Sequence, residues 1–338
     1  MPKWPDLAAG FKLLREVDLN AIRRQAESPS HLAVMGGRGT GKSTLINQLL
    51  TGSQQQSPGP VLPVLPAREY GLDGETPVGT CTLALLVIGT SGDDDARAQQ
   101  AFRHLLRDRV TVIVCYNQRG QTQDGGIVPV EGWQGAETVA VDFNDREMLT
   151  RVLAPAMLRA CPGREVQLAR NLPMLRQAVC RKLIDDTCMV NSTYSLATGL
   201  AEINVFLDLP LNVADIVILT KNQALMAYKI SLAMGLTGDW KETIPKMTAV
   251  VGSAFLWRQV ARLLVGLIPA YGIVPKIAVA YAGTYTVGQA IYQWCANGEK
   301  LRTEHLRSLY LSALKRGRET ALAVIARRKA LRHPQPRP

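Results

Sequence analysis

The sequence is poor in aromatic residues and lacks the cysteine pairs and the unbroken N-terminal apolar segment that mark several large classes of protein. Aromatic residues make up 6% of the 338 residues, and no RNA-binding aromatic motif is present. The six cysteines are scattered and include no C-x-x-C pair, which argues against a disulfide framework or a zinc module and suits a reducing cytosol. Charges at Asp6, Lys12, Arg15 and Glu16 interrupt the apolar residues of the N-terminus, so we do not expect export.

The positive charge of the chain is concentrated at its C-terminal end. The formal net charge is +11, and residues 300–338 contribute +9 of it, because they hold eleven lysines and arginines and two acids. This concentration indicates an anionic partner surface, either lipid headgroups or nucleic acid, although a solvated helix face is the plainer alternative. Because nucleic-acid-binding motifs are missing, we expect anionic lipid and regard nucleic acid as the weaker partner.

The first half of the chain alternates between two kinds of pattern, and the second half does not. Apolar, partly β-branched runs predict strands at 31–35, 82–88, 110–115 and 138–141. Helical spacing occurs at 43–50 and 96–107, and 53–66 and 120–135 have the composition of loops. The alternation favours a parallel sheet flanked by helices. Later segments predict helices alone, at 145–160, 164–190, 193–206, 213–234, 246–267, 273–294 and 299–329.

We expect the boundary between the two halves at Cys161-Pro162-Gly163, where a helix must stop. Before the first strand, residues 1–28 predict an amphipathic helix, which Asp6 can cap. The expected organisation is therefore this helix, an α/β domain over 29–162, a helical domain over 163–332 and a short tail over 333–338.

Residues 36–43, Gly-Gly-Arg-Gly-Thr-Gly-Lys-Ser, fit the phosphate-binding pattern G-x-x-x-x-G-K-[ST] at every fixed position. The glycines let successive backbone N–H groups point at phosphate oxygens, and the following helix adds the positive end of its dipole. Lys42 can neutralise β- and γ-phosphate oxygens, and the Ser43 hydroxyl can ligate Mg²⁺. The sequence therefore predicts an α/β P-loop NTPase domain followed by an all-α domain.

Two further motifs of guanine-specific P-loop proteins are degenerate. Glycine follows the strand 85–88, so we expect the Mg²⁺-holding acid of D-x-x-G at Glu75-Thr76-Pro77-Val78-Gly79 and take 85–88 as the next strand along. The base-reading motif N-K-x-D is represented by Asn117-Gln118-Arg119-Gly120, in which only the asparagine survives. Without a carboxylate to accept from guanine N1 and N2, discrimination against adenine is expected to fall. A plain turn role for Asn117 is the alternative.

Some segments of the helical half raise the question of a membrane. Residues 273–294 approach the ~20 residues of a span and carry the small residues Ala278, Ala282, Gly283 and Gly288 for close helix packing. Residues 247–268 carry Arg258 and Arg262 mid-segment, which favours an interface or a protein core. A soluble bundle with one buried helix is the alternative. In 299–329 the basic residues lie apart from an apolar stripe, an arrangement suited to an anionic membrane surface. The stripe is Leu306, Leu309, Ala313, Leu314, Ala321, Val324 and Ile325.

Three segments resemble Era-like P-loop GTPases fused to a C-terminal helical domain of unknown function, a bacterial family often predicted to be membrane-associated. They are 31–50 (HLAVMGGRGTGKSTLINQLL), 209–229 (LPLNVADIVILTKNQALMAYK) and 267–288 (LIPAYGIVPKIAVAYAGTYTVG). The resemblance implies phosphate contacts along the loop, Mg²⁺ at Ser43 and a base contact at Asn117. The candidate cofactor-binding residues are Gly36, Arg38, Gly39, Thr40, Gly41, Lys42, Ser43, Thr44 and Asn117.

Together these patterns predict an Mg²⁺-dependent GTP-binding protein that acts as a switch at the cytoplasmic face of a membrane. We expect slow or partner-dependent hydrolysis, because no residue is evident to orient the attacking water. Two alternatives stay open: a non-enzymatic membrane scaffold with a structural nucleotide site, and an ATP-binding P-loop protein. A cytoplasmic location is the alternative to membrane association.

Overall fold

The computed structural model describes residues 17–29, 31–52, 67–72, 81–89, 95–119, 126–127, 132–202, 213–236, 241, 243, 273–298 and 301–332. Several expectations lie outside these residues: the part of the N-terminal helix before Val17, the loop 53–66, the acid at Glu75, the helix 246–267 and the tail 333–338. The chain divides into two compact units. We call Ile22–Val179 with Leu232–Leu236 the sheet unit, and Met1–Ala21, Cys180–Ser231 and Thr237–Pro338 the helical unit.

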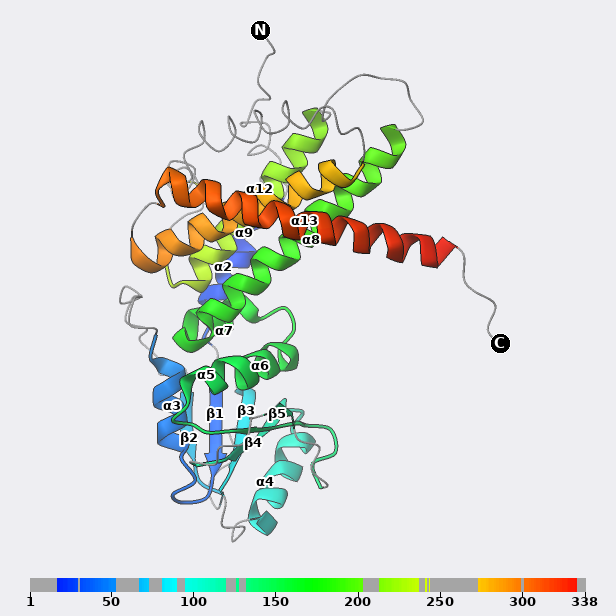
Figure 1. Cartoon of the computed structure of the whole chain (residues 1–338). Helices are drawn as coiled ribbons and strands as arrows, with labels where there is room; N and C mark the ends of the chain where they lie inside the picture. The colour runs from blue at the N-terminus through cyan, green and yellow to red at the C-terminus, as the bar shows by residue number, and fades with distance from the viewer. Residues whose placement is uncertain are drawn as a thin grey trace, which may run out of the picture. The chain divides into compact units, whose positions relative to one another are not determined.

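The sheet unit contains a six-stranded sheet in the order β2-β1-β3-β4-β6-β5 (Figure 1). Five strands are parallel, and the short β5 pairs antiparallel with β6. The strands are β1 (His31–Gly36), β2 (Ala67–Tyr70), β3 (Cys81–Ile88), β4 (Val112–Asn117), β5 (Gly126–Ile127) and β6 (Glu137–Val141). The predicted parallel sheet is confirmed, whereas the expectation of a loop throughout 120–135 is wrong, because β5 pairs within it.

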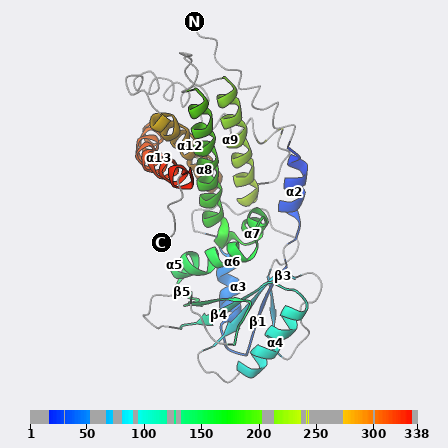
Figure 2. The same ribbon diagram turned by 90° about the vertical axis from the view of Figure 1, so that its right-hand side faces the viewer.

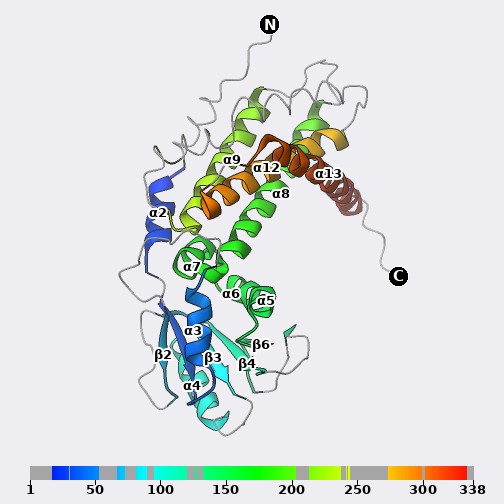
Figure 3. The same cartoon turned by 60° about the vertical axis from the view of Figure 1, so that its left-hand side comes forward.

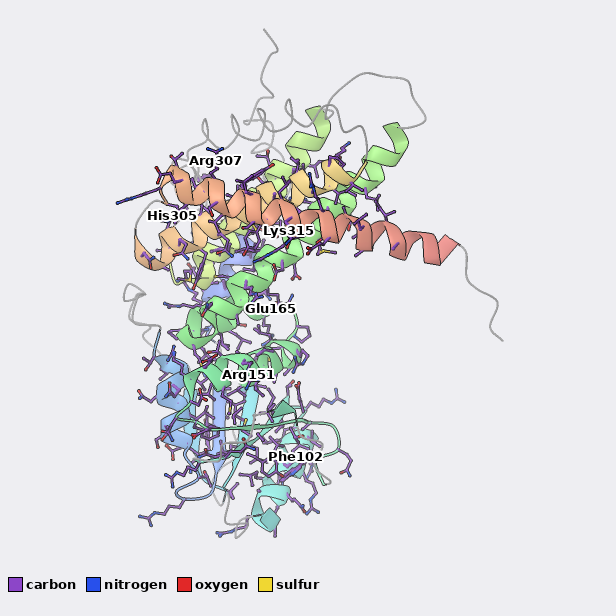
Figure 4. All side chains as sticks on the ribbon, viewed as in Figure 1. Phe102, Arg151, Glu165, His305, Arg307 and Lys315 are labelled. Atoms are coloured by element: carbon purple, nitrogen blue, oxygen red, sulfur yellow. The ribbon has the colours of Figure 1, made fainter. Side chains whose placement is uncertain are left out.

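Helices cover both faces of this sheet. Figures 2 and 3 show α4 (Asp95–Arg107) against one face and α3 (Lys42–Leu50) on the other. Because side chains alternate along a strand, every second residue of β1, β3 and β4 faces the apolar side of α4. Phe102 of α4, which Figure 4 labels, meets the ring of Trp133 edge to face at a centroid distance of 5.3 Å. Helices α3 and α4 confirm the two helices predicted between the strands.

The helices after the sheet break at different places from those expected. Residues 146–160 form α5 (Arg146–Met148), a π-helical turn (Leu149–Leu153) and α6 (Ala154–Ala160). The continuous helix expected over 164–190 is interrupted between α7 (Glu165–Asn171) and α8 (Arg176–Glu202), because Pro173 has no N–H and holds Leu172 extended. The expected break near residue 192 is absent: α8 continues through Asn191, whose side chain donates to the Thr284 hydroxyl at 2.8 Å. Cys161-Pro162-Gly163 forms the turn between α6 and α7, within the sheet unit.

Helix α7 ties together two segments of the sheet unit. The side chain of Gln167 donates to the carbonyls of Ser28 and Pro29, which lead from α2 (Leu19–Glu27) into β1. Arg170 is only 4% exposed, and its guanidinium donates to the carbonyls of Leu232 (3.2 Å) and Leu236 (2.9 Å). These carbonyls lie at and just beyond the last turn of α9 (Val213–Ala233), where a positive charge is favourable.

Replacing Arg170 with methionine is expected to lower the free energy of unfolding by about 2 kcal/mol, because the buried Leu232 carbonyl and the partly buried Leu236 carbonyl lose charge-assisted hydrogen bonds. Arg159→Met is the matched control, since Arg159 is half-exposed and pairs with Glu137 near the surface. That change should cost less than about 1 kcal/mol. Urea unfolding measures the free energy of unfolding of both variants. Equal decreases in the two would show that the buried Arg170 contacts stabilise the protein no more than a surface ion pair does.

Within the helical unit, α12 (Ile273–Asn297) and α13 (Thr303–Arg332) form an antiparallel hairpin (Figures 1 and 3). Gly317 of α13 faces the backbone of α12: an added Cβ would lie 2.7 Å from the Ala278 carbonyl oxygen. Gly288 similarly faces Ile184 of α8, whereas a Cβ on Gly283 would meet nothing within 4 Å. The predicted close helix packing by small residues therefore occurs at Ala278 and Gly288, whereas Gly283 makes no such contact.

The apolar stripe that the sequence places on 299–329 is largely used inside the hairpin. Leu306, Ala313 and Ala321 are buried and pack against α12 together with Tyr310. This stripe is therefore covered by protein in this structure, and the membrane contact expected of 299–329 stays a prediction that other residues of the helix would have to make. None of the helices in the described residues, α12 included, is long and apolar enough to cross a membrane.

Candidate functional site

The candidate site is built around the glycine loop, residues 36–43, which joins the carboxyl end of β1 to the N-terminus of α3. Gly39 (φ 79°) and Gly41 (φ 100°) have left-handed backbone conformations that side chains disfavour, which explains two of the glycines. No side chain caps the N-terminus of α3, whose first residue is Lys42. The first N–H groups of a helix lack partners within it, so this end is suited to an anion.

Lys42 places a buried positive charge inside the glycine loop. Its side chain is 8% exposed, and its ammonium group donates to the carbonyls of Gly36 (3.0 Å) and Gly37 (2.6 Å). Its Nζ also lies 3.4 Å from a carboxylate oxygen of Glu69. A charge held in this way at a helix N-terminus strengthens the attraction of the loop for anions.

Glu69 is the acidic residue of the site, and sequence reasoning missed it. Its carboxylate accepts a hydrogen bond from the Ser43 hydroxyl at 2.8 Å, in addition to its ion pair with Lys42. The residue lies on β2, where the parallel ladder sets it beside Val34 of β1. Strand β2 is four residues long with a single buried position, so no hydrophobic pattern reveals it. The one sequence feature that could have indicated Glu69 as a site residue is its position two residues before a glycine, in Glu69-Tyr70-Gly71, soon after a proline-rich stretch.

The carboxyl ends of β3 and β4 hold the other side of the loop. Asn117, the last residue of β4, is 6% exposed and donates through Nδ2 to the Thr40 carbonyl at 2.9 Å. A Cβ on Gly41 would lie 2.6 Å from that Nδ2, and a Cβ on Gly36 would lie 2.6 Å from the Val87 carbonyl oxygen. The loop is thus packed so closely that these two positions tolerate no side chain.

The structure brings most of the predicted site residues together. Gly36, Thr40, Lys42, Ser43 and Asn117 meet through the contacts described above, and Ser43 and Thr44 lie in the first turn of α3. Arg38 and Gly39 are exposed at the tip of the loop. Asn117 holds the loop in place through Thr40, and its Oδ1 is buried with no hydrogen-bond partner among the residues that the structure describes.

Cys115, in the middle of β4, has no part in this site. It is fully buried in the sheet, and burial raises the pKa of its thiol well above the usual range. A thiol that stays protonated is a poor nucleophile, so Cys115 is a core side chain.

The donor set fits a magnesium ion only if phosphate supplies further ligands. Within the described ranges, no three His, Cys, Asp or Glu side chains are grouped so that they could hold a metal by themselves. The Ser43 hydroxyl and the Glu69 carboxylate are hard oxygen ligands, and Mg²⁺ is commonly bound by one or two protein oxygens together with water and substrate phosphate. These residues could therefore hold Mg²⁺ at a bound phosphate group.

Comparison with known proteins adds no further guide to the chemistry of this site. The chain matches no protein-family model, no curated protein and no solved structure.

Proposed function

We propose that the glycine loop binds the Mg²⁺ complex of a nucleoside triphosphate, with GTP as the first candidate. The observation that carries the proposal is the buried Lys42 ammonium, enclosed by a glycine-rich turn at the uncapped N-terminus of α3. A cation and a row of backbone donors in one place match the charge and the oxygen geometry of a polyphosphate.

Each residue around the loop has a separate part in this proposal. Lys42 pairs with β- and γ-phosphate oxygens, and the N-terminal amides of α3 contact the β-phosphate. Ser43 and Glu69 hold the metal, which neutralises phosphate charge when bound. Asn117 keeps the loop in place through Thr40, so that the amides are oriented before the ligand arrives.

ATP is the second candidate, because Gly120 stands where N-K-x-D places its guanine-reading carboxylate. Without that carboxylate to accept from guanine N1 and N2, discrimination against adenine is expected to fall. Calorimetric titration of the full chain with GTP, GDP, ATP and ADP in Mg²⁺ tests both candidates. Absence of heat with all four nucleotides would refute the proposed function.

Glu69→Gln is expected to raise the Mg²⁺ concentration needed for nucleotide binding by about 10- to 100-fold, because an amide is a weaker ligand than a carboxylate. Affinity in the presence of a chelator should be unchanged or higher, since a negative charge near the phosphates has been removed. Fluorescent-nucleotide titrations over a range of Mg²⁺ concentrations measure this. Glu147→Gln, an exposed change on α5, is the control. Equal metal dependence in the two variants would remove Glu69 from the metal site.

We further propose that hydrolysis is slow without a partner, because the D-x-x-G and N-K-x-D patterns are degenerate in this chain. A multiple-turnover phosphate-release assay on the isolated protein measures the rate. Turnover at the several-per-second rate of an efficient enzyme would contradict this part of the proposal.

A further inference from the structure

Helix α13 presents a second surface, distinct from the stripe that packs against α12. Leu311 and Leu322 are large apolar side chains that are 48% and 60% exposed. Arg307, Lys315 and Arg318 are exposed as well. Successive members of this set are three or four residues apart, so they follow one face of the helix over about 22 Å. We call these five residues the outer stripe.

The outer stripe has no structural role that the hairpin explains. The inner contacts of α13 are made by a different set of positions, among them Tyr310, Gly317 and Ala321. Arg316, which lies off the outer stripe, sits over the ring of Tyr285 at 5.3 Å and donates to its hydroxyl. Within the described part of the helical unit, Lys315 and Arg318 have no ion pair or hydrogen bond of this kind.

The stripe combines two chemistries that point to one class of partner. Figure 4 shows the side chains of Arg307 and Lys315 extending from α13. Arginine and lysine attract phosphate groups of either lipid or nucleic acid. Interspersed leucines gain nothing from a nucleic-acid backbone, but they can enter the boundary between headgroups and acyl chains. Among the acids of α13, Glu304 lies on the same face three residues before Arg307, and Glu319 borders the stripe. Against three cations, the face stays net positive.

We propose that the outer stripe of α13 docks on an anionic lipid surface, with the helix lying in the plane of the interface. The leucines enter the headgroup boundary, and the three cations lie among the lipid phosphates with their aliphatic stems along the apolar layer. The hairpin with α12 stays intact in this arrangement, because the inner stripe remains covered by protein. Nucleotide binding is not needed for this contact.

Co-sedimentation of the full chain with vesicles tests the docking. We expect binding to vesicles of phosphatidylcholine mixed with phosphatidylglycerol, and weak binding to phosphatidylcholine alone. Lys315→Gln with Arg318→Gln should reduce the partition coefficient by about 25-fold, since each basic residue near the surface contributes about a factor of five. Leu311→Ser with Leu322→Ser should reduce it by about tenfold or more.

A control pair separates the stripe from general surface charge and apolarity. Leu106→Ser with Arg107→Gln changes an exposed leucine and an exposed arginine on α4, and should leave vesicle binding as in the wild type. All these positions are exposed, so we expect every variant to fold as the wild type does. Circular dichroism melting of each variant verifies that its helices are folded. Binding by both outer-stripe variants at the wild-type level would overturn the proposal. So would tighter binding of the wild-type chain to a DNA duplex than to the anionic vesicles.

Discussion

Lys42→Ala should lower the affinity for the Mg²⁺–nucleotide complex by at least about 100-fold. The ammonium group is the one cation enclosed by the described residues of the glycine loop, and losing two charge-assisted contacts to phosphate has an effect of this size. Glu69 would also face the phosphates without its partner, which adds repulsion. Titration with a fluorescent GTP analogue, repeated with an ATP analogue, measures the loss for both bases.

A control variant and a melting curve distinguish a loss of nucleotide affinity in Lys42→Ala from a loss of folding. Lys182→Ala on α8 removes an exposed lysine from an ion pair with Asp186, and should leave nucleotide affinity unchanged. Unaltered affinity in Lys42→Ala, with a melting curve like that of the wild type, would sink the proposal that the loop holds phosphate. In cells, the same variant distinguishes a switch from a scaffold, because a scaffold that needs no nucleotide keeps its function.

Gly317→Ala should destabilise the helical unit by about 3 kcal/mol. An added Cβ would lie 2.7 Å from the carbonyl oxygen and 2.9 Å from the Cα of Ala278, and backbone atoms cannot rotate away as a side chain can. The two helices would have to separate, and contacts such as that between Val279 and Tyr310 would loosen. This cost outweighs the gain in helix propensity of up to ~1 kcal/mol that alanine normally brings.

Gly283→Ala on α12 makes the same chemical change where a Cβ has open space. It should be neutral or stabilise the protein by up to ~1 kcal/mol. Urea unfolding followed by the helical circular dichroism signal compares the two variants. If both glycines behave alike, the close approach of α12 and α13 contributes nothing to stability.

The local sequence pattern was sufficient to predict the glycine loop and most strands of the sheet. The spacing of Gly36, Gly41 and Lys42 predicts a turn between a strand and a helix, and the structure places them there. This prediction succeeds because the conformation of such a turn depends on residues that are neighbours in the sequence. Helix breaks depended on more than the residue type. Pro173 ended a helix that the helical spacing predicted to continue, whereas α8 ran on through Asn191, whose side chain bonds Thr284 of another helix.

Glu69 shows why the acidic side of the site was not predictable. Its distance from Ser43 depends on the parallel pairing of β2 with β1, in which Val34 lies beside Glu69 although the two are far apart along the chain. No short-range sequence pattern predicts such a pairing, and β2 has too few residues to be predicted as a strand. The role of Asn117 as a brace is similar, since it depends on the end of β4 meeting the Thr40 carbonyl.

Residue types and their spacing were enough to predict the local conformations: a glycine loop between strand and helix, the alternation of strands and helices before residue 145, and the helical nature of most later segments that the structure describes. Three features needed the folded chain: the acid that meets Ser43, the face of α13 that α12 covers, and the leucines and cations that stay exposed. The physical reason is that backbone preference and capping act within a few residues, whereas burial and pairing depend on segments that the chain brings together from far apart.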